Sequence, residues 1–318
     1  MKMFIFKFIF KFDCGFSYES YCENQFMILI LGSTGYIGSY LVNHCDRNAM
    51  EFFGLSRSDV DYTNRDALFS FLQANQPKFL INAAGYTGKP NVDACESAKS
   101  DCLLGNSVLP GIIREVCEDL KIAWGHVSSG CIYSERRKDG KGWSEEDAPN
   151  FSFRSPPCSF YSGSKALGEE VLEGAENCYV WRLRIPFNEE RSPRNYLQKL
   201  LNYDSLLEAE NSVSHLEDFV QKCVQCFDQQ VEPGVYNMTN PGSVTTRQVT
   251  QWMQEYGVTD KLFQFFDDEE QFMNIAAKTP RSNCVLDTSK AEKAGIGMRP
   301  VEEAMRDSMR RMAKEVLA

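Results

Sequence analysis

Residues 27–38 read MILILGSTGYIG, where an apolar run leads into three glycines spaced three residues apart. The apolar run predicts a buried strand, and the glycines predict a turn that opens a helix. Gly32 permits the tight turn, Gly35 lets the backbone approach a pyrophosphate, and Gly38 lets the helix pack close to the sheet. Free N–H groups at the helix N-terminus favour bound phosphate. The stretch therefore predicts the first βα unit of a dinucleotide-binding fold.

After this unit, short apolar runs alternate with amphipathic stretches, as in a parallel βαβ sheet. We expect an α/β fold: a Rossmann doubly wound parallel sheet with a smaller C-terminal substrate-binding α/β lobe. Residues 27–185 are expected to form the Rossmann domain, 213–240 to return to it, and 186–212 with 241–318 to form the lobe. Strands are expected at 51–55, 79–85, 122–129, 179–185 and 234–239, and helices at 66–74, 104–119, 161–173, 245–257 and 301–317.

Composition narrows the class of protein. The chain of 318 residues is 43% hydrophobic and 25% charged, the balance of a soluble globular protein. Its formal net charge of -10 argues against nucleic-acid binding, which needs a basic face, and no apolar run is long enough to span a membrane. The 12 scattered cysteines favour a reducing, cytoplasmic location. Cys223 and Cys226 form the one C-x-x-C pair, and no metal site is expected there.

The first 26 residues stand apart from this pattern. Lys7 and Lys11 interrupt their Phe- and Ile-rich run, so the run lacks the continuous apolar core of a signal peptide. The fold signal begins sharply at Met27. We expect either that Met27 is the natural start or that residues 1–26 are an accessory leader.

The G-x-x-G-x-x-G spacing resembles the extended short-chain dehydrogenase/reductase superfamily, which implies a nicotinamide cofactor. Arg57 follows the second strand, where it is suited to pair with a 2′-phosphate, so NADPH is favoured. Asp59 lies close enough to leave NADH open. Asn82-Ala83-Ala84 resembles the segment beside the adenine and ribose. The expected cofactor-binding residues are Gly32, Thr34, Gly35, Tyr36, Ile37, Gly38, Arg57, Asn82, Ala83, Ala84, Tyr161 and Lys165.

Tyr161 and Lys165 lie four residues apart on a predicted helix and therefore share a face. We expect the Lys165 ammonium to lower the pKa of the Tyr161 phenol toward the working pH. Such a phenol can give its proton to the alkoxide that forms when hydride reaches a ketone. Ser129 ends a predicted strand, at the position where the superfamily carries a Ser or Thr that binds the substrate carbonyl.

Longer segments narrow the resemblance. AAGYTGKPNVDACES (83–97), GWSEEDAPNF (142–151), RIPFNEERSPRNYLQKL (184–200), YNMTNPGSVT (236–245) and PRSNCVLDTSK (280–290) resemble the dTDP-4-dehydrorhamnose reductase family. They are closer still to the plant and giant-virus UDP-4-keto-6-deoxyglucose 3,5-epimerase/4-reductases. The resemblance implies a nucleotide-sugar substrate held by Arg194 and Arg281 at its diphosphate and by Asn195 at the sugar or nucleotide. Asn106 matches an asparagine that flanks the cofactor in related enzymes, and we expect it to contact the substrate as well.

Cys131 and Lys199 resemble the acid–base pair that epimerises the sugar in the plant-type enzymes. SSGCIY places Cys131 after the strand-end serines, where the monofunctional reductases carry an aromatic residue, and PRN-x-x-x-K places Lys199 in the matching lysine position. A 4-ketone acidifies the hydrogens at C3 and C5, so a base and an acid on opposite faces can invert these carbons. We therefore expect catalytic roles for Tyr161, Lys165, Ser129, Cys131 and Lys199.

Two other interpretations stay open. One is a monofunctional dTDP-4-dehydrorhamnose reductase that relies on a separate epimerase. The other is a non-catalytic NADP-binding protein, since the regulatory subunit of methionine adenosyltransferase resembles the same family. Retention of Tyr161 and Lys165 favours catalysis. The loop 151–162 is longer than in the plant-type proteins, and the sequence leaves open the nucleotide base, the final sugar stereochemistry and whether the chain forms a homodimer.

Overall fold

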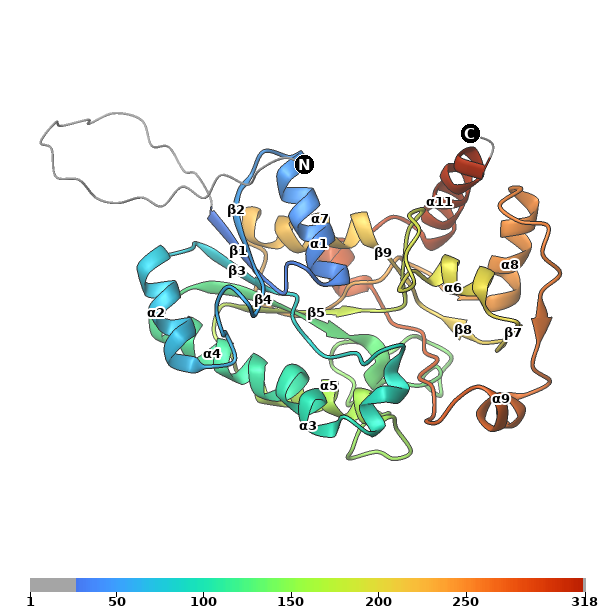
Figure 1. The fold of residues 1–318 in the computed structure, drawn as a ribbon, viewed down its shortest axis with the longest axis horizontal. Helices are drawn as coiled ribbons and strands as arrows, with labels where there is room; N and C mark the ends of the chain where they lie inside the picture. Colours follow the sequence, from blue (N-terminus) through green and yellow to red (C-terminus); the bar gives the residue numbers. More distant parts are fainter. Residues whose placement is uncertain (1–26, 317–318) are drawn as a thin grey trace, which may run out of the picture.

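A parallel sheet forms the centre of the molecule, which a computed structural model describes over residues 27–316. Its six strands run in the order β10-β5-β4-β3-β1-β2, and every pairing is parallel (Figure 1). The predicted doubly wound sheet is confirmed, and the predicted strand at 234–239 does join it, beside β5. The strands are β1 (Met27–Leu31), β2 (Glu51–Leu55), β3 (Phe79–Asn82), β4 (Ala123–Ser129), β5 (Cys178–Leu183) and β10 (Gly234–Asn237).

Helices cover both faces of the sheet, as its hydrophobic pattern requires (Figure 1). Ile28 and Ile30 face the core under α1 and α7, whereas Leu29 and Leu31 face the core under α2 and α4. The covering helices are α1 (Tyr36–Arg47) and α7 (Leu216–Asp228) on one face, and α2 (Arg65–Asn75), α4 (Leu109–Leu120) and α5 (Phe160–Val171) on the other.

The helix predicted over 104–119 begins earlier and contains a wider turn. α3 (Lys99–Leu103) continues through the π-helical η2 (Leu104–Val108) into α4. Pro110 has no N–H to give to the carbonyl of Asn106, four residues before it. That carbonyl lies against α5, where a Cβ on Gly168 would come within 2.1 Å of it. The missing hydrogen bond and the close helix contact together account for the π turn.

The C-terminal part of the chain builds a second core beside the carboxyl ends of the strands (Figure 1). Val301, Met305 and Met309 of the last helix are fully or almost fully buried in it, so the methionine stripe serves packing. Its elements are β6 (Pro186–Phe187), α6 (Tyr196–Asn202), β7 (Ser205–Leu206), β8 (Glu210–Asn211), β9 (Ser214–His215), β11 (Val244–Thr245), α8 (Thr246–Glu255), β12 (Gln264–Phe265), α9 (Glu269–Ile275) and α11 (Val301–Val316). The remaining short helices are η1 (Val92–Glu96), η3 (Gly130–Ile132) and α10 (Ser289–Lys293).

No helix among residues 27–316 is long and apolar enough to cross a membrane. In the same range no group of three or more His, Cys, Asp or Glu side chains is arranged to hold a metal ion. Cys223 and Cys226 are fully buried in the core under α7. The leader expected at 1–26 lies outside the described residues.

Candidate active site

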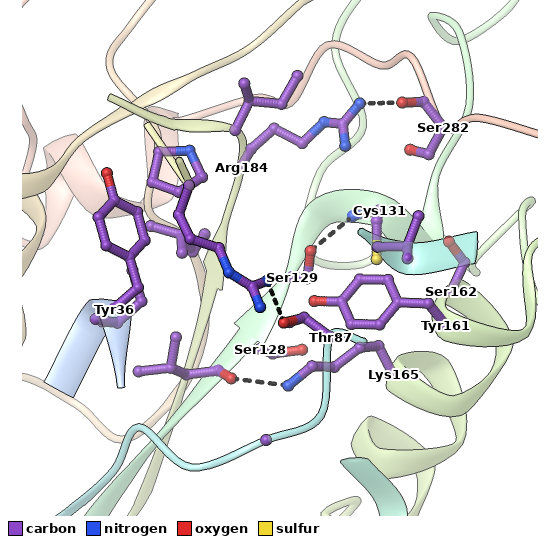
Figure 2. A pocket seen from close by; sticks show the side chains of 18 of the residues that line it. Tyr36, Thr87, Ser128, Ser129, Cys131, Tyr161, Ser162, Lys165, Arg184 and Ser282 are labelled. Carbon is purple, nitrogen blue, oxygen red and sulfur yellow. Dashed lines mark hydrogen bonds between the residues drawn. The ribbon is translucent and has the colours of Figure 1, made fainter. Parts of the chain in front are cut away.

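A cavity of about 440 Å³ opens at the carboxyl ends of β1, β3, β4 and β5, where the second core meets the sheet. The strand order reverses between β1 and β3, and such a switch point leaves a crevice that α/β folds use for ligands. Figure 2 shows Tyr161 between Lys165 on one side and Ser129 and Cys131 on the other, with Tyr36 across the opening. The cavity unites twelve of the predicted site residues: Gly35, Tyr36, Ile37, Ala83, Ala84, Ser129, Cys131, Tyr161, Lys165, Arg194, Lys199 and Arg281.

The glycine turn is fixed by close backbone contacts. Gly32 has a φ of 75°, and a Cβ there would come within 2.7 Å of the nitrogen of Ala84. A Cβ on Gly38 would come within 2.0 Å of the Gly32 carbonyl oxygen. Both positions therefore require glycine, which lets β1, the turn and α1 pack against the end of β3.

The N-terminus of α1 is left open for an anion. Its N-cap is Gly35, which has no side chain to accept the first helical N–H groups, and the first turn carries no acidic residue. These N–H groups therefore lack an acceptor within the described part of the protein, and with the positive end of the helix dipole they lie in the cavity wall. Gly35, Tyr36 and Ile37 of this turn line the cavity, whereas Gly32, Thr34 and Gly38 stand outside its lining.

The loop after β2 exposes both Arg57 and Asp59, but Asp59 is hydrogen-bonded within the loop. Arg57 is exposed and lies outside the cavity lining. The Asp59 carboxylate instead accepts hydrogen bonds from the backbone N–H of Ser56 at 2.8 Å and from its hydroxyl at 2.7 Å. Asp59, the acid that would favour NADH, is thus hydrogen-bonded within its own loop, while the Arg57 guanidinium is free to bind a phosphate.

Tyr161 and Lys165 project from α5, whose N-cap is Ser159. Lys165 is buried, and its ammonium donates a hydrogen bond to the carbonyl of Val127 at 3.2 Å. The expected net lowering of the Tyr161 pKa is wrong. Burial raises the pKa of the phenol, and the nearby Cys131 thiol adds to the rise, whereas the Ser129 hydroxyl opposes it. The phenol therefore keeps its proton at neutral pH.

Ser129 and Cys131 come from the turn where β4 ends. The Ser129 hydroxyl caps η3 by accepting the N–H of Cys131 at 3.3 Å, which leaves its own hydrogen to donate. Burial raises the pKa of the Cys131 thiol, although Ser129, Ser162 and the Arg184 charge act in the opposite direction. The thiol is therefore protonated at neutral pH.

Lys199 reaches the same cavity from α6. Its ammonium makes no hydrogen bond or ion pair with any residue from 27 to 316. Burial lowers its pKa, and the positive charges of Arg194 and Arg281 lower it further. An amine in this setting gives up its proton more readily than an exposed lysine. The cavity thus holds a protonated thiol and an amine of lowered pKa.

Arg194 and Arg281 line the cavity but are already engaged. Arg194 donates hydrogen bonds to the Thr87 hydroxyl and, at 3.0 Å, to the carbonyl of Gly88. Arg281 donates a hydrogen bond from each of its terminal nitrogens to the carboxylate of Asp93. Sequence reasoning identified the two cations but gave no sign of these partners, which lie more than 100 residues away along the chain.

Three predicted asparagines lie behind the cavity wall, and all three are fully buried. Asn82 bonds the N–H of Ala84 and the ring of His126. Asn106 bonds both the N–H and the carbonyl of Tyr86 and so fixes the segment after β3. Asn195 caps α6. The amides of Asn106 and Asn195 are used within the protein, and their expected substrate contacts stay a prediction.

Several cavity residues were not named individually in the sequence analysis, although Arg184, Ile185 and Ser282 lie in segments quoted there. Arg184 follows β5; its terminal Nη2 donates to the Asn211 side chain at 2.5 Å and to the Ser282 carbonyl, while its buried Nε has no partner among the described residues. Ile185 lines the cavity with a φ of 36°, a strained value for a β-branched residue. Residues 184–185 follow the carboxyl end of a strand, and this position could have identified them as site residues. The others include Thr87, Ser162 and Ser282.

A second cavity of about 810 Å³ adjoins the first, and Val92, Arg194, Lys199 and Arg281 line both. Its far wall is aromatic and amide-rich, with Phe265, Phe266, Phe272, Gln264 and Gln271. The two cavities therefore form one elongated site with cationic side chains at their junction.

Comparison with known proteins gives a family match over nearly the whole chain. The model described as RmlD substrate binding domain matches residues 26–314. A bifunctional dTDP-4-dehydrorhamnose 3,5-epimerase/dTDP-4-dehydrorhamnose reductase of Arabidopsis thaliana is 30% identical over 89% of this chain and 92% of its own length. A trifunctional UDP-glucose 4,6-dehydratase/UDP-4-keto-6-deoxy-D-glucose 3,5-epimerase/UDP-4-keto-L-rhamnose-reductase of the same plant is 31% identical over 87% of this chain. The chain spans only 40% of that longer enzyme.

Solved structures show the same fold. The UDP-rhamnose synthase of Acanthamoeba polyphaga mimivirus matches with a TM-score of 0.83, over 91% of this chain and 100% of that one, at 22% identity. The dTDP-4-dehydrorhamnose reductase of Bacillus anthracis, solved with NADP, matches with a TM-score of 0.76 at 16% identity, over 92% and 100% of the two chains.

Proposed function

The chain belongs to the RmlD substrate binding domain family, and on that premise we propose that it reduces the 4-keto group of a nucleotide-linked 4-keto-6-deoxy sugar with NADPH. The product is a nucleotide-linked rhamnose. The observation that carries the proposal is the meeting of Tyr161, Lys165 and Ser129 with the α1 N-terminus in one cavity. The relatives of at least 30% identity are reductases of such sugars by name, which supports the same substrate class.

The residues of the first βα turn fit a dinucleotide cofactor. The uncapped α1 N-terminus at Gly35 suits the pyrophosphate, and Arg57, beside an Asp59 that is hydrogen-bonded to Ser56, suits a 2′-phosphate. Ala83 and Ala84 suit the adenosine side, and Lys165 suits the nicotinamide ribose. NADPH, when bound, supplies the hydride that reaches C4 of the sugar.

The reduction needs a proton for the alkoxide that forms at C4. Tyr161 is suited to give it, because its raised pKa keeps the phenol protonated until an oxyanion approaches. The Ser129 hydroxyl accepts a backbone N–H and can donate its own hydrogen to the carbonyl oxygen. The Lys165 ammonium, held by Val127, provides a fixed positive charge beside the phenol and eases its loss of the proton.

The same cavity suits epimerisation before reduction. We assign Lys199 as the base, since its lowered pKa makes a neutral amine accessible, and Cys131 as the acid, since its raised pKa keeps the proton on sulfur. The amine takes a proton from a carbon beside the ketone, and the electron pair moves to the carbonyl oxygen as an enolate. The thiol returns a proton to that carbon on the opposite face, which inverts it.

The elongated site suits a nucleotide sugar in one orientation. With the sugar ketone at Tyr161, the diphosphate lies at the junction lined by Arg194 and Arg281, and the base enters the second cavity among Phe265 and Phe272. We assign the sugar-nucleotide side of the site to the lobe formed by 186–212 and 241–318. The ten cysteines described between 27 and 316 are free thiols, which supports a reducing compartment such as the cytoplasm.

An assay of NADPH oxidation tests the proposal. The protein is given UDP- or dTDP-4-keto-6-deoxyglucose, alone and with an added 3,5-epimerase, and the product is identified by NMR. Oxidation without the added enzyme, with a rhamnose product, supports the bifunctional reaction. Oxidation only with the added epimerase supports the monofunctional alternative. No oxidation under either condition overturns the reductase.

A further inference from the structure

The carboxylate of Asp93 holds Arg281, an arginine that lines both cavities of the elongated site. It lies in η1, within the segment PNVDACES, and accepts hydrogen bonds from Nη1 and Nη2 of Arg281 at 2.6 and 2.8 Å. Both side chains are largely shielded, with 13% of Asp93 and 21% of Arg281 exposed. Asp93 lines neither cavity, whereas Arg281 lines both. The acid therefore acts on the site through the arginine it holds.

The hydrogen bonds of Arg281 leave one edge of its guanidinium unused. The outer edge, formed by Nη1 and Nη2, faces Asp93, and the remaining N–H of Nη1 donates to the carbonyl of Thr279 at 3.2 Å. Of the five N–H groups of an arginine, the Nε–H and one Nη2–H remain, and they point the same way along the side edge. Two parallel N–H groups match two oxygens of a phosphate. The bidentate pair thus leaves a complete phosphate-binding fork.

Asp93 also orders the segment that carries Arg281. Burial raises the pKa of its carboxyl, but the hydrogen bonds and charge of Arg281 and the backbone N–H of Lys278 outweigh burial, and the pKa lies below its usual value. The carboxylate is therefore charged at neutral pH and binds residues 278 and 281 together. Arg194 is attached to the same loop through Thr87 and Gly88. Loop 87–93 is thus the common support of both arginines at the junction.

We propose that Asp93 is a positioning residue that holds Arg281 with its free edge ready for the diphosphate of the nucleotide-sugar substrate. The proposal rests on the function proposed above. An arginine freed from its carboxylate must be ordered on binding, and that ordering weakens affinity by about twofold to tenfold. The opposite expectation is that Asp93 only neutralises Arg281 and competes with phosphate, in which case removing its charge tightens binding.

The test compares Asp93→Asn, Arg281→Gln and the double variant with wild type. Isothermal calorimetry measures Kd for UDP and for dTDP, and steady-state assays measure KM and kcat for the 4-keto sugars. We expect Asp93→Asn to raise Kd and KM by about twofold to tenfold, leave kcat and the Kd of NADPH unchanged, and add nothing in the Arg281→Gln background. The matched control is Asp119→Asn, which removes an exposed carboxylate partner of Arg65; neither residue lines a cavity, and the change should alter none of these values.

Each outcome decides the proposal. Unchanged or tighter binding by Asp93→Asn overturns it, and so does an equal loss in the wild-type and Arg281→Gln backgrounds, because Asp93 then acts independently of the arginine. A wild-type protein that binds neither UDP nor dTDP overturns both this proposal and the proposed function. If wild type binds them, Asp93→Asn weakens binding as expected and no 4-keto sugar is turned over, the positioning role stands and the proposed reaction falls.

Discussion

Replacing Gly38 with alanine should weaken NADPH binding while leaving the overall fold intact. The added Cβ would stand 2.0 Å from the Gly32 carbonyl oxygen and 2.7 Å from its carbon, both backbone atoms that cannot rotate away. Ordinary contact begins at 3.4 Å, so a gap of 1.4 Å (3.4 minus 2.0) must open between α1 and the glycine turn. A shift of that size carries the α1 N–H groups out of hydrogen-bond range of a bound pyrophosphate.

The expected loss of affinity follows from those hydrogen bonds. A hydrogen bond to a charged group contributes about 1.5–3 kcal/mol, so losing one raises the Kd of NADPH by roughly tenfold to hundredfold. Calorimetric titration with NADPH measures this value, and circular dichroism checks the fold. The control is Gly174→Ala, where φ is 72° but no heavy atom lies within 4 Å of the added Cβ. This control should lower the unfolding free energy by about 1–2 kcal/mol without changing Kd. A Gly38→Ala protein with wild-type affinity for NADPH would refute the reasoning.

Three further predictions concern the chemistry and the core behind it. Cys131→Ala should still reduce a pre-epimerised 4-keto sugar but not turn over the un-epimerised one; equal NADPH oxidation with both would remove the epimerase role. Turnover of the un-epimerised sugar should rise with pH as Lys199 loses its proton and fall at higher pH as Cys131 loses its proton. The rise should have an apparent pKa below that of a free lysine, and the fall an apparent pKa above that of a free cysteine. A pH profile identical to that of the pre-epimerised sugar would contradict this assignment. Glu169→Gln should lower the unfolding free energy by about 3–5 kcal/mol in urea titrations, because buried Arg182, which donates to Glu169 at 2.8 Å, loses its charged partner; a change under about 1 kcal/mol would argue that the pair is not needed.

Local sequence patterns predicted the frame of the molecule. The run at 27–38 strongly favours one structure, because its apolar residues are stable as a buried strand and its glycines permit a close turn. The Tyr161 and Lys165 pair likewise needed only helical spacing to share a face. These features depend on contacts within a few residues, which a single sequence displays directly.

Long-range contacts set the limits of that prediction. Lys165 lies beside Tyr161, but the Val127 carbonyl holds its ammonium and burial dominates the pKa of the phenol, so the direction of the shift was predicted wrongly. Nothing near Arg281 in the sequence indicates that Asp93, 188 residues before it, occupies its outer edge. The π turn at Asn106 depends on both Pro110 and the approach of Gly168 from α5. Burial and partners of this kind arise only when distant segments pack.

The central claim is that the Tyr161 phenol gives its proton to the C4 oxygen during reduction, and one rate tests it most directly. Single-turnover NADPH oxidation is measured for Tyr161→Phe with a saturating pre-epimerised 4-keto sugar, so that neither epimerisation nor binding limits the rate. We predict a loss of about 10²–10⁴-fold with an unchanged Kd for NADPH. Oxidation by Tyr161→Phe within a few-fold of wild type would contradict the claim.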